Sequence, residues 1–524
     1  MTNSLKIVLL LFLSIFSILI NNLYGNIGIF PIDSFAFFDT GYNILLDKHP
    51  FRDFWITTGP LVDYIQAIFF KLFGLEWSSY VLHASVFNLL ITTSVFLSLN
   101  KHGLNIFSSF FYSISVAVLC YPISGTPFAY IHAYILSLIS ILIFTLAIRT
   151  KSNHYWFLLP FSMLCAFLCM QTPSVYINII LIFFLLVYLS LNFNFKKILY
   201  FILGSITILL FFILFLFKFE IPIASLIEQY LLFPISIGEY RVYGNDMNEI
   251  SLLSKRLTFR NLLGHFKFIN ILLILIIFLT CINYLKKFKN FLTKEDIIIN
   301  LSLVFSSFVF IFNQLIIYNQ TFIFSLIPFL AGFLHITLKK FFSDKKLLNI
   351  LLILFITFVT TKYHIEYNVK RKFMDLQNVD LGLSARGDLI HKKFNNLKWI
   401  TPAFSQNPKK EIELLKEVVD VLNEDQRSTM LMTHYNFFQT ILEKNLNMPN
   451  RWYTNDNNSY PLANHKYYKY YKNYFMNFIK KNNIEVIYMV GDPKIKNFKI
   501  YVDNICFVDK KINEITMMHE LKKC

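Results

Sequence analysis

Three charged residues early in the chain, Asp33, Arg52 and Asp53, are of the types needed for acid–base chemistry on a phosphorylated substrate. A carboxylate within hydrogen-bond reach of a hydroxyl can take up its proton while the oxygen attacks another atom. A guanidinium can hold a phosphate through two parallel hydrogen bonds and so stabilise it as a leaving group. By residue type, Asp33 is therefore a candidate general base, Arg52 is a candidate to bind a phosphate, and Asp53 is a candidate for a supporting catalytic or metal-binding role.

Each of these residues also has a structural interpretation. Asp33 precedes a helix expected over 34–46, and its side chain could simply cap that helix. Asp53 follows Arg52, and the two could form no more than an ion pair at the membrane surface. The remaining acidic residues expected to have structural or solvated roles are Asp39 and Asp63.

The composition places these residues in a membrane protein. Hydrophobic residues make up 55% of the 524 residues and charged residues only 15%, whereas a soluble protein carries roughly a quarter charged residues. The apolar residues form about eleven runs long enough to span a bilayer. The first run is long for a signal peptide and lacks a cleavage site, so it is expected to remain as a span. The predicted spans are 5–23, 77–99, 105–121, 131–148, 155–171, 174–194, 198–217, 267–285, 296–318, 321–338 and 347–363.

The basic residues predict how these spans are oriented. If Lys6 lies in the cytoplasm, the outward loops 122–130, 172–173 and 319–320 contain no Lys or Arg, while the loops on the other side are basic. This contrast is the positive-inside pattern. The net charge of +17 is therefore explained by topology and lipid headgroups, and no element that would read nucleic acid is visible. The cytoplasmic basic residues are Lys101, Arg149, Lys151, Lys196, Lys197, Lys286, Lys287, Lys289, Lys294, Lys339, Lys340, Lys345 and Lys346.

Three hydrophilic segments then face the outer compartment: 24–76, 218–266 and 364–524. We expect a transmembrane domain over 1–363 and a small α/β extracytoplasmic domain over 364–524. No glycine-rich phosphate loop is present in the second domain, so no nucleotide site is predicted. Its expected elements are helices over 409–423 and 461–482 and strands over 428–434 and 484–490. Cys506 and Cys524 could pair if the domain lies outside, and the sequence leaves that choice open.

The second outer segment returns to the membrane with a run of cations, KRLTFRNLLGHFK. Upstream, a surface helix is expected over 223–233, with Glu228 facing water. The cations are candidates to bind a substrate phosphate, and anchoring to lipid headgroups is the alternative. Their position outside, against the usual bias, favours substrate binding. The candidates are Lys255, Arg256, Arg260, His265 and Lys267.

Polar residues at the outer ends of two spans either line a cavity that admits a sugar or bond between helices. Acidic residues are nearly absent from the middle of the spans, which weighs against an ion-coupled transporter. The polar residues in question are Gln171, Thr172, Asn313, Gln314, Asn319 and Gln320.

The first outer segment resembles a known family. Residues 31–74 read PIDSFAFFDTGYNILLDKHPFRDFWITTGPLVDYIQAIFFKLFG. They contain an Asp after the first span, a helix, PFRDFW, GPL, and an aromatic-rich amphipathic helix expected over 61–74 that ends in LFG. This pattern is similar to the GT-C superfamily of membrane glycosyltransferases, and most similar to its protein O-mannosyltransferase-like and aminoarabinose-transferase-like bacterial branch. The resemblance implies a polyprenyl-phosphate-linked sugar donor and a catalytic base at the matching position, Asp33.

The expected function is therefore transfer of a sugar to an acceptor hydroxyl on the outer face of a bacterial cytoplasmic membrane, with inversion. The acceptor could be a glycan, a lipid or a protein. A divalent cation could neutralise the phosphate in place of protein cations, and the sequence leaves that choice open. The alternatives are a transporter or flippase, or a polymerase or ligase, of lipid-linked saccharides.

Overall fold

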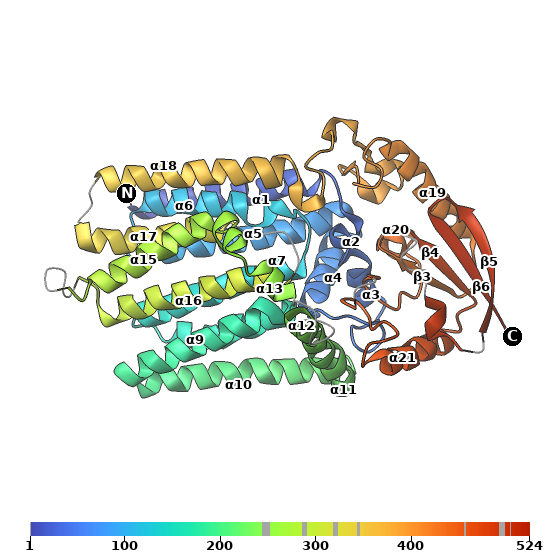
Figure 1. Ribbon diagram of the computed structural model, residues 1–524, viewed down its shortest axis with the longest axis horizontal. Coiled ribbons are helices and arrows are strands. Elements are labelled where there is room, and N and C mark those ends of the chain that lie inside the picture. The colour runs from blue at the N-terminus through green and yellow to red at the C-terminus, as the bar shows by residue number, and fades with distance from the viewer. Residues whose placement is uncertain are drawn as a thin grey trace.

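The computed structural model has a bundle of long helices at one end and a smaller α/β part at the other, with the first hydrophilic segment between them (Figure 1). The predicted architecture, a polytopic helical protein with a small C-terminal sheet domain, is confirmed. The residues that the structure describes are 2–243, 252–285, 291–317, 323–342, 346–454, 457–491, 498–503 and 505–523. The predictions for Lys286, Lys287, Lys289, Asn319, Gln320, Lys345 and Cys524 fall outside these residues.

Every predicted span overlaps a helix of the bundle. Eight helices in the described ranges, α1, α5, α6, α7, α9, α10, α16 and α18, are long and apolar enough to cross a membrane. The other predicted spans correspond to the shorter helices α8, α15 and α17, so the total of eleven stays a prediction. The bounds are α1 Thr2–Gly25, α5 Trp77–Lys101, α6 Ile106–Leu119, α7 Ala129–Arg149, α8 His154–Cys169, α9 Gln171–Leu191, α10 Phe195–Lys218, α15 Lys267–Ile282, α16 Lys294–Ile316, α17 Leu326–Phe342 and α18 Lys346–Tyr363.

Burial separates the central helices of the bundle from those at its edge. In α7, 89% of the most apolar stretch of 18 residues is buried, whereas the buried share of the corresponding stretch is 6% in α10 and 17% in α1. Helices that expose leucine, isoleucine and phenylalanine on most of their surface are suited to contact with lipid. The helices at the edge therefore present apolar faces to the bilayer, and α7 forms the core.

The first hydrophilic segment folds into three helices: α2 Pro31–Ser34, α3 Phe38–Leu45 and α4 Leu61–Phe73. The prediction of one helix over 34–46 is only partly right, because α3 lies within that range but a turn at 35–37 separates it from α2. Most of α3 is buried between the bundle and the C-terminal part. The second amphipathic helix, expected over 61–74, is confirmed as α4.

The second hydrophilic segment forms short helices beside the end of α10 (Figure 1). The prediction of one helix over 223–233 is only partly right, since a π-helical turn over Ile227–Leu232 follows α11 and leads into α12. Glu228 in that turn is partly buried and does not simply face water. The bounds are α11 Ile223–Leu226, α12 Phe233–Tyr243, α13 Leu252–Arg256 and α14 Phe259–Gly264.

The C-terminal part contains a four-stranded sheet of order β3-β4-β6-β5. Strands β3 and β4 are parallel and joined through α21, whereas β6 is antiparallel to both of its neighbours. The strands expected over 428–434 and 484–490 are confirmed as β3 and β4, and the helix over 409–423 as α19. The helix expected over 461–482 is present as α21 but begins only at Tyr468. The β5–β6 hairpin was not predicted. The bounds are α19 Pro408–Glu424, α20 Phe438–Leu442, α21 Tyr468–Lys481, β1 Ala385–Arg386, β2 Lys398–Trp399, β3 Thr429–Thr433, β4 Val486–Val490, β5 Ile505–Asn513 and β6 Thr516–Lys523.

Trp55 joins the first segment to the C-terminal part. Its ring is buried against Phe233 and Tyr471, and its indole N–H donates to the carbonyl of Ser459 at 2.9 Å. Its backbone N–H donates to the carbonyl of Pro449 at 2.7 Å. The C-terminal part therefore shares an aromatic core with Trp55 of the first segment and Phe233 of the second.

Candidate active site

Asp33 is the third residue of α2, which begins after Phe30. The prediction that Asp33 caps the following helix is wrong, because no capping bond from its side chain is present. The neighbouring residues hold the helix instead: the Ser34 hydroxyl accepts from the N–H of Phe30 at 2.9 Å, and the Trp452 indole donates to the carbonyl of Ile32 at 2.9 Å. Asp33 is thus fixed by its neighbours, and no described residue holds its carboxylate.

The environment of Asp33 suits a base. Among the residues that the structure describes, none donates a hydrogen bond to the Asp33 carboxylate or pairs with it. The residue is partly exposed by surface area, but protein atoms crowd its carboxyl group. This burial, together with the nearby carboxylate of Asp375, raises the pKa of Asp33 to about 7. A base with such a pKa is half ionised near neutral pH and binds a transferred proton well.

Asp375 was not predicted from the sequence. It follows the short turn Lys372–Met374 in a left-handed conformation, with φ of 55°. Its turn lies against α2, since the Ser34 hydroxyl is 3.5 Å from the sulfur of Met374. No local signal marks Asp375, because it is one acidic residue in a polar segment some 340 positions after Asp33.

A buried ion pair lies close to this base. Asp63 of α4 pairs with Arg451 of the C-terminal part, and both side chains are at most 1% exposed. Arg451 also donates to the hydroxyl of Thr58, and its guanidinium lies over the ring of Phe37 at 4.3 Å. The Tyr80 hydroxyl lies within electrostatic reach of Asp63, Arg451 and Asp33. The expectation that Asp63 has a structural role is therefore supported, whereas Arg451 was missed.

Asp39 has a structural role of a different kind. Its carboxylate accepts from the backbone N–H of Thr440 at 2.9 Å, from the Thr440 hydroxyl at 2.6 Å and from the N–H of Gln439 at 3.3 Å. These donors belong to the first turn of α20. Asp39 therefore binds the beginning of a helix that lies in the C-terminal part, which fixes α3 against it.

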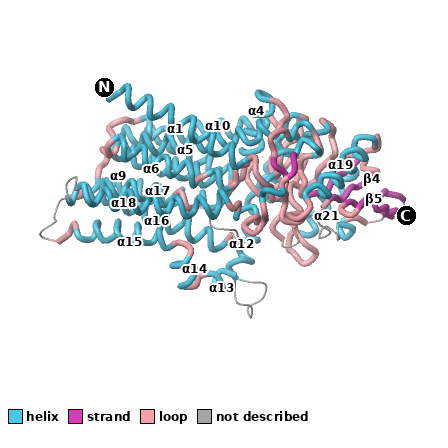
Figure 2. Tube along the Cα trace, turned by 90° about the horizontal axis from the view of Figure 1, so that it is seen from above, coloured by secondary structure: helices cyan, strands magenta, loops and turns pink. Residues whose placement is uncertain are grey.

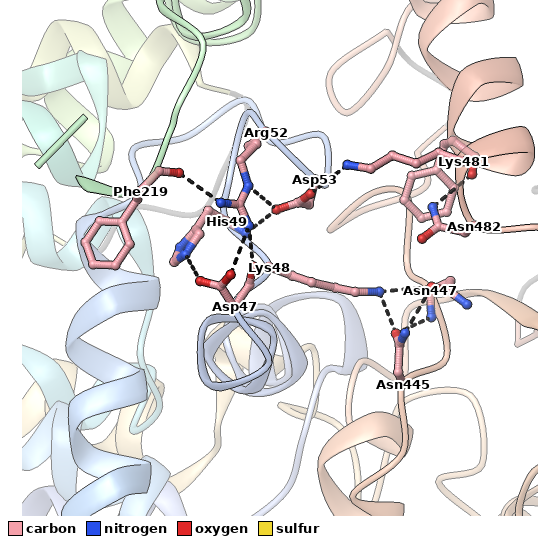
Figure 3. Close-up of polar contacts among 11 residues, drawn as sticks. Asp47, Lys48, His49, Arg52, Asp53, Phe219, Asn445, Asn447, Lys481 and Asn482 are labelled. Atoms are coloured by element: carbon pink, nitrogen blue, oxygen red, sulfur yellow. Dashed lines mark hydrogen bonds and ion pairs between the residues drawn. The ribbon is translucent and has the colours of Figure 1, made fainter. Parts of the chain in front are cut away.

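Arg52 lies in a cluster of charged residues in which its donors are occupied (Figure 3). Its Nε donates to Asp53 at 2.6 Å, one terminal nitrogen donates to the carbonyl of Phe219 at 3.0 Å, and the other donates to the carbonyl of Asp47. Arg52 and Asp53 thus form the ion pair that the sequence suggested as an alternative to phosphate binding. None of these contacts connects Arg52 with Asp33.

The same cluster holds Asp53 in its ionised form. Burial acts to raise the pKa of Asp53, but hydrogen bonds from the His49 N–H, from Arg52 and from Lys481 outweigh it and leave the pKa below its usual value. Lys481 comes from the end of α21 and lies 3.1 Å from Asp53. Together, Arg52 and Asp53 connect the first segment to the second segment and to the C-terminal part (Figure 3).

Four of the candidate cations lie on α13, on α14 and just after α14, where these short helices project from the molecule (Figure 2), and the fifth, Lys267, begins α15. Lys255, Arg260 and His265 are exposed, and Arg256 is partly buried. In the part of the chain that the structure describes, Lys255 and Arg260 have no ion-pair partner. Unlike Arg52, these two cations can bind a phosphate without first breaking a protein contact.

The polar residues at the span ends divide into two kinds. The Gln171 amide donates to the carbonyls of Thr57 at 2.8 Å and Tyr230 at 2.7 Å, so it links both outer segments to α9. Asn313 and Gln314 are buried at the end of α16.

Within the described ranges, no group of three or more His, Cys, Asp or Glu side chains could hold a metal ion.

Comparisons with known proteins add the following. No family model and no curated protein matches the sequence. The chain is similar to ArnT from Cupriavidus metallidurans in the apo state, with a TM-score of 0.49 and 11% identity over 99% of this chain and 98% of that one. It is also similar to an Archaeoglobus fulgidus oligosaccharyltransferase tethered with an acceptor peptide, with a TM-score of 0.46 and 13% identity over 95% and 70% of the two chains. ArnT and the archaeal enzyme are members of the GT-C superfamily.

Proposed function

We propose that this chain is a membrane glycosyltransferase of the GT-C type, which moves a sugar from a polyprenyl-phosphate donor to an acceptor hydroxyl. The observation that carries the proposal is the carboxylate of Asp33, which has no hydrogen-bond partner among the described residues and has its pKa raised to about 7. Asp33 also lies in the segment whose motifs resemble the superfamily, which supports its assignment as the general base. The resemblance supplies the donor class, and the environment of Asp33 supplies the base.

The proposed reaction is a single displacement. The acceptor oxygen attacks the anomeric carbon and forms the new C–O bond as the bond from that carbon to the phosphate oxygen breaks. The electrons of the broken bond go to the departing lipid phosphate, and the hydroxyl proton goes to Asp33. Attack from the face opposite to the leaving group inverts the anomeric configuration.

The departing phosphate needs positive charge. Lys255 and Arg260 are the cations that we assign to it first, because they are exposed and unpaired in the described structure, with His265 and the partly buried Arg256 beside them. Arg52 is assigned a supporting role, because its donors hold Asp53 and two backbone carbonyls.

We further propose that the site faces the outside of a bacterial cytoplasmic membrane, with the N-terminus in the cytoplasm. The three hydrophilic segments gather at one end of the bundle (Figure 1), and the positive-inside pattern assigns that end to the outside. Cys506 of β5 is disulfide-bonded, which suits an oxidising compartment. The proposed division is a transmembrane domain over 1–363 and an extracytoplasmic domain over 364–524.

The test is a transfer assay with purified protein in nanodiscs. Candidate polyprenyl-phosphate-linked sugars serve as donors and cell-envelope fractions as acceptors, and release of polyprenyl phosphate is measured. We expect release that depends on acceptor, with a product whose anomeric configuration, read by NMR, is opposite to that of the donor. Retained configuration would exclude the single displacement, and transport of the intact donor without release would favour a flippase.

A further inference from the structure

A groove opens between the ends of α1 and α5 that lie nearest the C-terminal part. Its volume is about 640 Å³, within the usual range for sites that bind small molecules. Leu19 and Leu23 of α1, Leu82 of α5 and Phe73 at the end of α4 line its apolar side. Leu19, Leu23 and Phe73 are each more than half exposed. Since α1 and α5 are candidate spans, this side of the groove is open to lipid chains.

The other side of the groove is polar. It is lined by Lys398 of β2, by Asn396 and by Asn22 and Asn26 at the end of α1. Lys398 is exposed, and no described residue forms an ion pair with it. The side-chain oxygen of Asn26 is buried and has no hydrogen-bond partner in the described part of the chain. The groove thus offers a cation and a buried acceptor, each unpaired among the described residues, beside an apolar wall.

We propose that this groove binds a membrane phospholipid with an anionic, hydroxyl-bearing headgroup such as phosphatidylglycerol. The acyl chains would lie along Leu19, Leu23 and Leu82, the phosphate would pair with Lys398, and a headgroup hydroxyl would donate to Asn26. A lysine near the bilayer surface attracts anionic lipid. The groove lies apart from the cations assigned to the donor phosphate, since α1 and α14 are on opposite sides of the molecule (Figure 2).

The backbone connects this groove to the candidate base. The N–H of Lys398 donates to the carbonyl of Asn26 at 2.9 Å, and the N–H of Gly28 donates to the carbonyl of Lys398 at 3.0 Å. The N–H of Ile29 then donates to Ile400 at 3.0 Å. This short ladder ends four residues before Asp33, so a bound lipid would hold the C-terminal part against the end of α1.

The test is photo-crosslinking in phosphatidylcholine nanodiscs that contain a small fraction of phosphatidylglycerol with a diazirine on its acyl chain. Labelled peptides are identified by mass spectrometry in the wild type, in Lys398→Gln and in Leu82→Trp, which fills the groove. The matched control is Lys416→Gln, which removes an exposed charge from α19. Thermal unfolding of each variant verifies that it is folded.

We expect phosphatidylglycerol to label residues 18–27 and 78–85 in the wild type and in Lys416→Gln. Labelling should fall about fivefold in Lys398→Gln and be lost in Leu82→Trp. Equal labelling of Lys398→Gln and Lys416→Gln would overturn the proposal, as would labelling that survives in Leu82→Trp. Equal labelling by a phosphatidylcholine probe would show only general lipid contact and would also overturn it. None of these readouts depends on sugar transfer.

Discussion

Asp33 differs from the other aspartates of the first segment in what surrounds its carboxylate. Asp39 binds the start of α20, Asp63 is paired with an arginine, and Asp47 and Asp53 belong to the cluster around Arg52. Hydrogen bonds and opposite charges lower the pKa of a carboxylate, whereas burial raises it. Burial raises the pKa of Asp39 to about 7 and also raises that of Asp63, but both carboxylates already accept hydrogen bonds from protein groups. No described residue donates to the carboxylate of Asp33, whose pKa is raised to about 7 by burial and by the like charge of Asp375.

The first prediction concerns pH. Because the pKa of Asp33 is raised to about 7, Asp33 should be protonated and inactive below that pH, and kcat/KM for transfer should rise through about pH 7. Asp375→Asn removes a like charge, so the pKa of Asp33 should fall, and the acid limb of the profile, where kcat/KM rises, should move to lower pH. A rate profile measured from acid to alkaline pH tests both statements, and an unmoved limb in Asp375→Asn would contradict the assigned contact.

At the scale of the elements, Arg52 connects the first outer segment to the second. Its donors hold Asp53, the carbonyl of Asp47 and the carbonyl of Phe219. Lysine keeps the charge but cannot reach all three acceptors with one ammonium. The contacts of residue 52 thus require the planar guanidinium of arginine.

The second prediction follows from that shape. Arg52→Lys should destabilise the protein by about 1.5–3 kcal/mol, the range for hydrogen bonds to charged groups. Lys481→Gln, which removes an exposed partner of Asp53, should cost less than about 1 kcal/mol. Thermal unfolding in detergent measures both. A loss of donor affinity with no loss of stability in Arg52→Lys would show instead that Arg52 binds the phosphate.

How far the elements could be predicted depended on whether their signals are local. Spans and the helices over 409–423 and 61–74 follow from periodicity within one segment. The break between α2 and α3 was missed because Phe35, which is buried, packs against Trp77, Trp399 and Phe437, two of which are distant in sequence. The β5–β6 hairpin was missed because β5 is largely exposed and does not alternate clearly.

The site was predictable only in part for the same reason. Asp33 carries a family motif, so it could be selected from the sequence. Asp375 and Arg451 carry none, and their closeness to the first segment is set by how the C-terminal part packs. A partner that lies hundreds of residues away leaves no spacing pattern to read.

At the scale of the whole molecule, the Asp63–Arg451 pair fastens the C-terminal part to the first segment. Both groups are buried, so removal of one leaves an uncompensated charge in the interior. The third prediction is that Arg451→Met destabilises the protein by about 3–5 kcal/mol. The double variant Asp63→Leu with Arg451→Met should recover most of that loss. Thermal unfolding measures both, and equal stability of the single and double variants would contradict a coupled pair.

The fourth prediction concerns orientation. A cysteine introduced at Lys416 on the exposed face of α19 should react with a membrane-impermeant maleimide in intact cells. A cysteine at Lys151, in a loop assigned to the cytoplasm, should react only after permeabilisation. The described native cysteines other than Cys506 lie in or beside the helices of the bundle, so each variant is compared with the unmodified chain. The reverse pattern would invert the proposed topology.

The most direct test of the whole account is sugar transfer by the Asp33→Asn variant. Asparagine keeps the size of the side chain and removes its basicity, while Asp420→Asn makes the same change on the exposed face of α19 and serves as the control. We predict that Asp33→Asn lowers kcat by a factor of about 10² to 10⁴, with unchanged thermal stability, and that Asp420→Asn transfers sugar at the wild-type rate. Transfer by Asp33→Asn near the wild-type rate would contradict the assignment of Asp33 as the base.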